Sequence, residues 1–148
     1  SDLHLVLAGK LDPSCPPPSG KKVHYLGMLS HADTAVLFNA LDVGIVYIRD
    51  TPYGRFSFPQ KAYEMAACET PMAVTRIGAM ATLFQETPEI LYEPDDTSSL
   101  IDCIKQQLRS PIRTQLHIPT WAEQATHFLN SLPMPLVVNG NIANQRTQ

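Results

Sequence analysis

Residues 43–75 read VGIVYIRDTPYGRFSFPQKAYEMAACETPMAVT, and an apolar run opens this stretch. Such a run, over 43–48, is typical of a strand buried on both faces. Residues 49–57 are expected to form a loop, because Pro52 and Gly54 favour turns. An alanine-rich helical segment follows, and a second apolar strand over 71–75 closes the unit. A strand, a helix and a strand in this order predict two parallel strands joined by a crossover helix.

The same alternation continues upstream of this stretch. We expect strands over 3–9 and 23–27, of which the first is again apolar throughout. A loop over 11–22, rich in proline, serine and glycine, joins the two strands. Ser30 is placed to cap a helix. The apolar stripe of that helix is predicted from helical spacing to consist of Val36, Leu37, Ala40 and Leu41.

Downstream, the pattern repeats with shorter elements. Gly78 is expected to open a turn into a helix over 79–85, followed by a strand over 89–93. A helix over 95–109 should face inward through Leu100, Ile101, Ile104 and Leu108. A last helix over 119–132 is predicted around Trp121, Ala125 and Phe128. The whole pattern predicts an α/β fold with a doubly wound, Rossmann-like parallel sheet covered by helices on both faces.

Length and composition narrow the function classes. The chain has 148 residues, enough for one domain, which we place at 1–132 with a polar tail at 133–148. The net charge is −3, so the sequence does not show the excess of positive charge that is typical of nucleic-acid-binding proteins. Three widely spaced cysteines argue against a disulfide framework or zinc site and favour a reducing compartment. The histidines lack the spacing of metal ligands and are interpreted as core or surface residues.

The helix over 58–68 lies where a doubly wound sheet binds ligands, just past the carboxyl end of a strand. Ser57 is expected to cap it, with Pro59 tolerated in the first turn. The backbone N–H groups of Gln60 and Lys61 would then form an anion site. Two interpretations of Glu64 stay open at this point. It either forms a surface pair with Lys61 or accepts hydrogen bonds from sugar hydroxyls next to a bound phosphate.

Two longer segments carry a family resemblance. Residues 23–48, VHYLGMLSHADTAVLFNALDVGIVYI, and residues 58–84, FPQKAYEMAACETPMAVTRIGAMATLF, resemble the carboxyl-terminal half of glycosyltransferase family 4, also called group 1. The ordered features are Gly27 after a strand, Asp42 before a strand, a Pro-x-Lys-x-x-Glu helix and then Gly78. The likeness extends over about residues 3–132. It implies the donor-binding half of a retaining, metal-independent, nucleotide-sugar-dependent enzyme of the GT-B fold.

The resemblance also implies roles for individual residues. Glu64 resembles the second glutamate of the family's Glu-x7-Glu motif, which binds the ribose hydroxyls of the donor. The backbone amides of Gln60 and Lys61 fall where the family contacts the distal phosphate, and main-chain atoms of Leu29 fall where it contacts the nucleobase. Pro59 and Gly78 are further candidates for the donor site.

The sequence departs from the family at two places. Phe56 stands where the motif has its first glutamate, and Arg55 is no substitute, so no catalytic residue is assigned. The family's domain also begins with a strand, a glycine and an Arg/Lys pair that grip the diphosphate, and residues 1–148 start after them. We therefore expect the sheet to lack its first strand, with a gap between the strands over 3–9 and 43–48. The amino-terminal acceptor domain is not in this sequence either.

The function expected from the resemblance is hexosyl transfer from a nucleotide-diphosphate sugar to a glycan or lipid-linked acceptor, as in polysaccharide biosynthesis. No cofactor and no metal are expected. The intact enzyme would work in the cytoplasm or at the inner face of a membrane, by peripheral association, while this chain alone would be inactive and self-associate along open strand edges. Two alternatives remain: a non-catalytic nucleotide-binding or interaction module, and a GT-B-type nucleotide-sugar epimerase.

Overall fold

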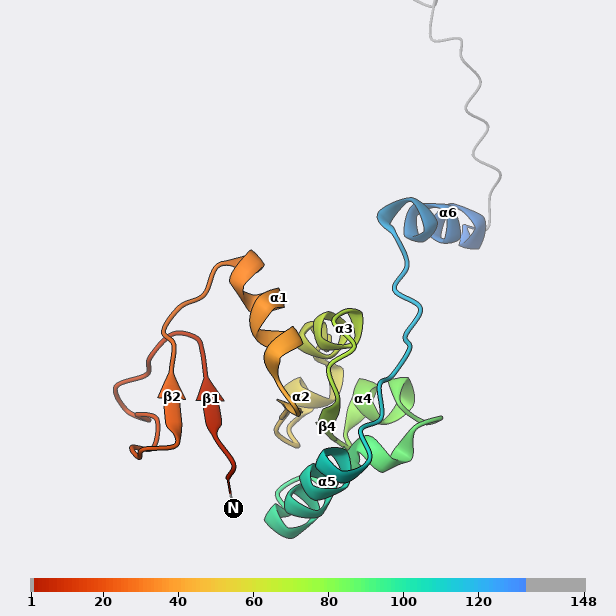
Figure 1. Cartoon of the computed structure of the whole chain (residues 1–148). Helices are drawn as coiled ribbons and strands as arrows, with labels where there is room; N and C mark the ends of the chain where they lie inside the picture. The colour runs from red at the N-terminus through yellow and green to blue at the C-terminus, as the bar shows by residue number, and fades with distance from the viewer. Residues whose placement is uncertain (1, 133–148) are drawn as a thin grey trace, which may run out of the picture. The chain divides into compact units, whose positions relative to one another are not determined.

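The computed structural model describes residues 2–132, along which helices and parallel strands alternate (Figure 1). The chain divides into a first compact unit over 1–116 and a second over 117–148. The strands, all in the first unit, are β1 (Leu5–Leu7), β2 (Val23–Tyr25), β3 (Gly44–Val46), β4 (Met72–Thr75) and β5 (Leu91–Tyr92). The helices of the first unit are α1 (His31–Ala40), α2 (Pro52–Phe56), α3 (Gln60–Ala67), α4 (Gly78–Leu83), the 3-10 helix η1 (Pro88–Ile90) and α5 (Thr97–Arg109). The second unit contains α6 (Trp121–Ser131).

The strands form two parallel sheets. In the first, β1 pairs with β2, and Val6 lies opposite His24. In the second, the order is β3-β4-β5. Every pair is parallel, which confirms the predicted α/β class. Within residues 2–132 no strand pairs with the second edge of β1 or of β3, which agrees with the gap expected between these two strands.

The core of the first unit forms around β4, whose four residues are all buried. On one face of the sheet, Met72 and Val74 join an apolar cluster with buried residues of α3 and α4. On the other face, Ala73 packs with Tyr92 and with Cys103 of α5. Since successive side chains of a strand point to opposite faces, these clusters show that helices cover both faces of β3-β4-β5.

A buried threonine joins the carboxyl ends of the three strands. The Thr75 hydroxyl donates to the Val46 carbonyl oxygen (3.2 Å) and accepts from the Ile48 amide (3.1 Å). It also lies 2.9 Å from the Tyr92 hydroxyl, which completes its hydrogen bonds. This end of the sheet, where ligands of doubly wound folds bind, is thereby held in a fixed geometry.

Three local predictions are wrong. Residues 49–57 are not all loop, because α2 forms with the Thr51 hydroxyl accepting from the Gly54 amide (3.0 Å) and with a proline in its first turn. Ser57 ends α2, so it does not cap α3, which begins after Pro59 without a side-chain cap. The start of the strand expected over 89–93 is taken up by η1.

The expected burial of several apolar residues is also wrong. β1 and β2 contain no buried residue, and in the β3 region Ile45 is 36% and Tyr47 50% exposed. Neither apolar cluster of the described residues includes β1, β2, Ile45 or Tyr47, so these side chains lack the helix packing that buries β4. On α1 the buried residue is Phe38, whereas Val36 and Ala40 are exposed.

The helices after β5 differ from the prediction in the same way. On α5 the buried residues are Cys103 and Gln107, while Ile101 and Leu108 are exposed. In the second unit, α6 begins with a capping box between Thr120 and Glu123 but contains no buried residue. The predicted tail at 133–148 lies outside the described residues. None of the helices within 2–132 is long and apolar enough to span a membrane.

Candidate functional site

Close packing of α3 on β3 sets the position of Glu64. Ala62, Met65 and Ala66 are buried in the core, so this face of α3 is fixed against the sheet. Gly44 of β3 makes the approach possible, because a Cβ there would lie 2.6 Å from the sulfur of Met65. Glu64 lies beside this packed face and is half-buried. The backbone of α3 therefore holds the carboxylate at a defined place.

The partner of Glu64 is a neighbouring glutamine rather than a lysine. Gln60 Nε2 donates to Glu64 Oε1 at 2.8 Å, one turn earlier on α3. Lys61 is exposed, and no ion pair between Lys61 and Glu64 forms among the described residues. The surface pair weighed from the sequence is therefore not formed.

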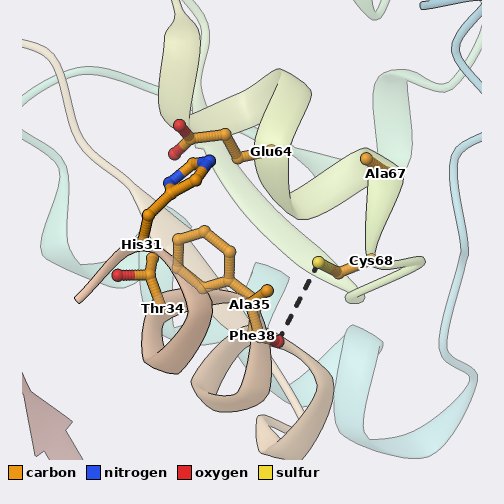
Figure 2. A pocket seen from close by; sticks show the side chains of 7 residues that line it. All are labelled: His31, Thr34, Ala35, Phe38, Glu64, Ala67 and Cys68. Atoms are coloured by element: carbon orange, nitrogen blue, oxygen red, sulfur yellow. Dashed lines mark hydrogen bonds between the residues drawn. The ribbon is translucent and has the colours of Figure 1, made fainter. Parts of the chain in front are cut away.

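Glu64 lines a pocket of about 180 Å³ between α1 and α3 (Figure 2). Figure 2 shows the Glu64 carboxylate and the His31 imidazole at one end of this pocket and the Cys68 thiol toward the other. The Cys68 sulfur lies 4.0 Å from the Ala35 carbonyl oxygen. The complete lining is His31, Thr34, Ala35, Phe38, Glu64, Ala67 and Cys68. Its volume is below the roughly 300–1,000 Å³ of sites for drug-sized ligands, so it suits one ring of a larger ligand.

The first turn of α3 is only partly free to bind an anion. The Gln60 amide donates to the Phe58 carbonyl oxygen (3.0 Å), so this N–H already has an acceptor. No acceptor for the Lys61 amide occurs among residues 2–132. The rings of Phe58 and Tyr63 stack with centroids 5.3 Å apart across this turn. Lys61 thus offers the free amide of the predicted pair.

The other predicted site residues lie outside this pocket. Leu29 is half-buried in the segment between β2 and α1, two positions before His31. Pro59 is buried, and Gly78 begins α4 with a φ of 48°. Of the predicted residues, Glu64 alone is among the described residues that line the pocket.

The position of the missing glutamate is occupied by an exposed aromatic side chain. Phe56, at the end of α2, is 89% exposed. Next to it, Arg55 Nε donates to Asp50 Oδ1 at 2.6 Å. This hydrogen bond lowers the pKa of Asp50 and raises the pKa of Arg55, so both side chains stay charged and paired. Within 2–132, no group of three or more His, Cys, Asp or Glu residues is arranged to hold a metal ion.

Sequence reasoning did not identify the α1 side of the pocket. His31, Thr34 and Phe38 come to face α3 only when the chain folds. The sequence held one indication of a ligand position at His31. This residue directly follows the cap residue Ser30 and so begins a helix that comes after a strand. On the sequence alone, this histidine is interpreted as a core or surface residue. The structure places it at the surface, where it can also contact a ligand.

Comparison with known proteins identifies the family. The family described as "Glycosyl transferases group 1" matches residues 1–110, about three quarters of the chain. Neither the curated proteins nor the solved structures compared with the chain give a match. The family match covers both sheets, α1 to α5 and the pocket between α1 and α3. The chain therefore belongs to the group 1 glycosyltransferases, and its role lies in glycosyl transfer.

Proposed function

We propose that this chain is the donor-binding part of a retaining glycosyltransferase that takes a sugar from a nucleotide-diphosphate sugar. The observation that carries the proposal is the Glu64 carboxylate, which α3 and Gln60 hold at the pocket between α1 and α3. A carboxylate so placed can accept hydrogen bonds from the ribose hydroxyls. The free amide of Lys61, in the first turn of the same helix, suits a phosphate oxygen.

The wider proposal follows from the family resemblance. The acceptor, a glycan or a lipid-linked sugar, would be held by a second domain outside these 148 residues, and transfer would need no cofactor or metal. The intact enzyme would act as a hexosyltransferase in polysaccharide biosynthesis, in the cytoplasm or peripherally at the inner face of a membrane. Leu29 would contact the nucleobase through its main chain. The chain by itself would bind the donor without transferring the sugar.

Titration with UDP, GDP and ADP tests the nucleotide site directly. Amide NMR signals of Leu29 and of α3 from Gln60 to Glu64 should shift with one of the three at millimolar concentration. Weak binding is expected because the strand, glycine and Arg/Lys pair that grip the diphosphate in the family are not in this sequence. An unchanged spectrum with all three nucleotides would refute donor binding and leave an interaction module as the better interpretation.

Substitution of Glu64 then tests its assigned role. Glu64→Ala should lower nucleotide affinity by about 1.5–3 kcal/mol, since a charge-assisted hydrogen bond is lost. The free energy of unfolding should change by less than about 0.5 kcal/mol, because the side chain is not part of the core. Glu86→Ala, at an exposed glutamate outside the pocket, is the matched control and should leave affinity unchanged. Equal affinity in the two variants would contradict the role of Glu64.

A further inference from the structure

His31 shares the polar end of the pocket with Glu64 but has no part in the donor site described so far. It is the first residue of α1, and its side chain is exposed. Figure 2 shows its imidazole directed toward the Glu64 carboxylate at one end of the pocket. Neither a hydrogen bond nor an ion pair joins the His31 side chain to any residue within 2–132. Its ring nitrogens are therefore available to a ligand that enters the pocket.

Glu64 can satisfy only the donor groups of a sugar diol, and the acceptor oxygens of the diol need another partner. An ionised carboxylate only accepts hydrogen bonds, and Glu64 Oε1 already accepts one from Gln60. A hydroxyl group, by contrast, both donates and accepts. Glu64 can accept a hydrogen bond from a ribose hydroxyl, but the oxygens of the diol also need a hydrogen-bond donor. A neutral imidazole supplies one donor and one acceptor, and a protonated imidazole supplies two donors.

We propose that His31 is a second side-chain ligand of the donor nucleotide, and that it binds the ribose together with Glu64. The imidazole donates to one ribose hydroxyl oxygen, while the carboxylate at the same end of the pocket accepts from a ribose hydroxyl. The apolar walls below, from Ala35, Phe38 and Ala67, contact the carbon atoms of the ring. This inference rests on the proposed function and adds to it a residue contributed by α1.

Nucleotide affinity of His31 variants provides the first test. The dissociation constant is measured for whichever of UDP, GDP or ADP the chain binds. His31→Ala should raise it about fivefold, the effect of one lost hydrogen bond. His31→Gln keeps a donor and an acceptor and should restore most of the affinity. His127→Ala, at an exposed histidine on α6, is the matched control and should leave the constant unchanged.

A cycle with deoxynucleotides localises the contact to the ribose. The same titrations use the 2′-deoxy and 3′-deoxy forms of the bound nucleotide. If His31 contacts a ribose hydroxyl, His31→Ala should have almost no further effect on the form that lacks that hydroxyl, because the two changes remove the same interaction. Equal fivefold losses with the ribo and both deoxy forms would overturn the ribose contact.

Alkylation of cysteines gives a readout on the unmutated protein. Cys68 lines the pocket, whereas Cys15 is exposed outside it. Saturating nucleotide should slow the reaction of iodoacetamide with Cys68, as measured by mass spectrometry, and leave Cys15 unaffected. Unchanged labelling of Cys68 in the presence of bound nucleotide would place the ligand elsewhere and overturn the proposal.

The outcomes separate this inference from the proposed function. If no nucleotide binds, both fail. If a nucleotide binds and Glu64→Ala weakens it while His31→Ala does not, the donor site stands and the role of His31 is refuted. Circular dichroism of the His31 variants checks that they are folded, and the deoxynucleotide titrations of His31→Gln test the contact if His31→Ala is not folded.

Discussion

Gly78 occupies a position that only glycine can fill without distortion. Its φ of 48° lies in the left-handed region, which residues with a Cβ rarely adopt. A Cβ at this site would also overlap the carbonyl oxygen of Arg55, where α4 packs against α2. These two constraints explain the glycine through packing. Its role as a turn that approaches the donor phosphate remains a prediction.

Replacement of Gly78 should therefore affect stability strongly. We expect Gly78→Ala to lower the free energy of unfolding by more than about 2 kcal/mol, because the left-handed conformation alone costs roughly 1–2 kcal/mol and the overlap adds to it. Urea unfolding measures the change. Gly20→Ala is the control, since a Cβ there meets only Val23 Cγ2 at an ordinary 3.7 Å. Similar stability of the two variants would contradict the close approach of α2 and α4.

The residues of the site differ in how far the sequence could identify them. That Glu64 lies at a pocket was predictable from its place on a helix after a strand and from the family motif, whereas its contact with the donor stays a prediction. The pairing of Glu64 with Gln60 instead of Lys61 depends on the side-chain rotamers of α3, which the sequence does not show. The place of His31 in the pocket lining was not predictable, because it depends on the packing of α1 on α3.

At the scale of elements, sequence periodicity predicted the strands and the helices α1, α3 and α5. It failed to predict burial where a polar side chain is buried by its hydrogen bonds. Gln107 is buried on α5 because its Nε2 donates to the Met72 carbonyl oxygen (2.8 Å) and its Oε1 accepts from the Ile112 amide (2.8 Å). A stripe chosen by hydrophobicity could not include this residue. α2 was missed because Pro52 and Gly54 favour turns, although Pro52 is also suited to the first turn of a helix.

The packing of α5 on β5 predicts a loss of stability in alkaline solution. Burial raises the pKa of the Cys103 thiol and of the Tyr92 phenol. A group whose pKa is raised by folding holds its proton more tightly in the folded state, so the unfolded state ionises first. The contribution of these two groups to the free energy of unfolding should be constant well below pH 9, the ordinary pKa of the thiol, and fall as the pH rises through it.

Unfolding in urea at a series of pH values measures this dependence. Cys103→Ala should reduce the alkaline slope, whereas Cys15→Ala, at an exposed cysteine, should leave it as in the unmodified chain. An alkaline slope that is the same in all three proteins would exclude Cys103 as a source of the effect.

Across the first unit, burial is distributed very unevenly between the two sheets. The sheet β3-β4-β5 contains the buried core, whereas β1 and β2 contain no buried residue. A two-stranded sheet without cover is marginally stable in water. β1 and β3 each pair with one strand among residues 2–132, so the backbone groups on their second edges are open to another strand. The sequence predicted this gap because the family's strand order places a further strand between them.

These open edges predict self-association of the chain. Gly44 donates its amide to the carbonyl oxygen of Pro71, which directly precedes β4, so the N–H and C=O of Ile45 point to the unpaired edge of β3. We expect light scattering to give a mass that rises above 16.4 kDa with concentration. Ile45→Lys should suppress the rise, because a charge on an edge strand opposes pairing with another chain.

Ile101→Lys distinguishes pairing of strand edges from non-specific association through exposed apolar residues. Ile101 is 44% exposed on α5 and Ile45 is 36% exposed on β3, so both substitutions add the same charge at a similar exposure. Ile101→Lys should leave the association unchanged if strand edges are responsible. Equal suppression by both lysines would mean that apolar surface, and not the β3 edge, drives association. A mass of 16.4 kDa at every concentration would show that neither edge recruits a second copy.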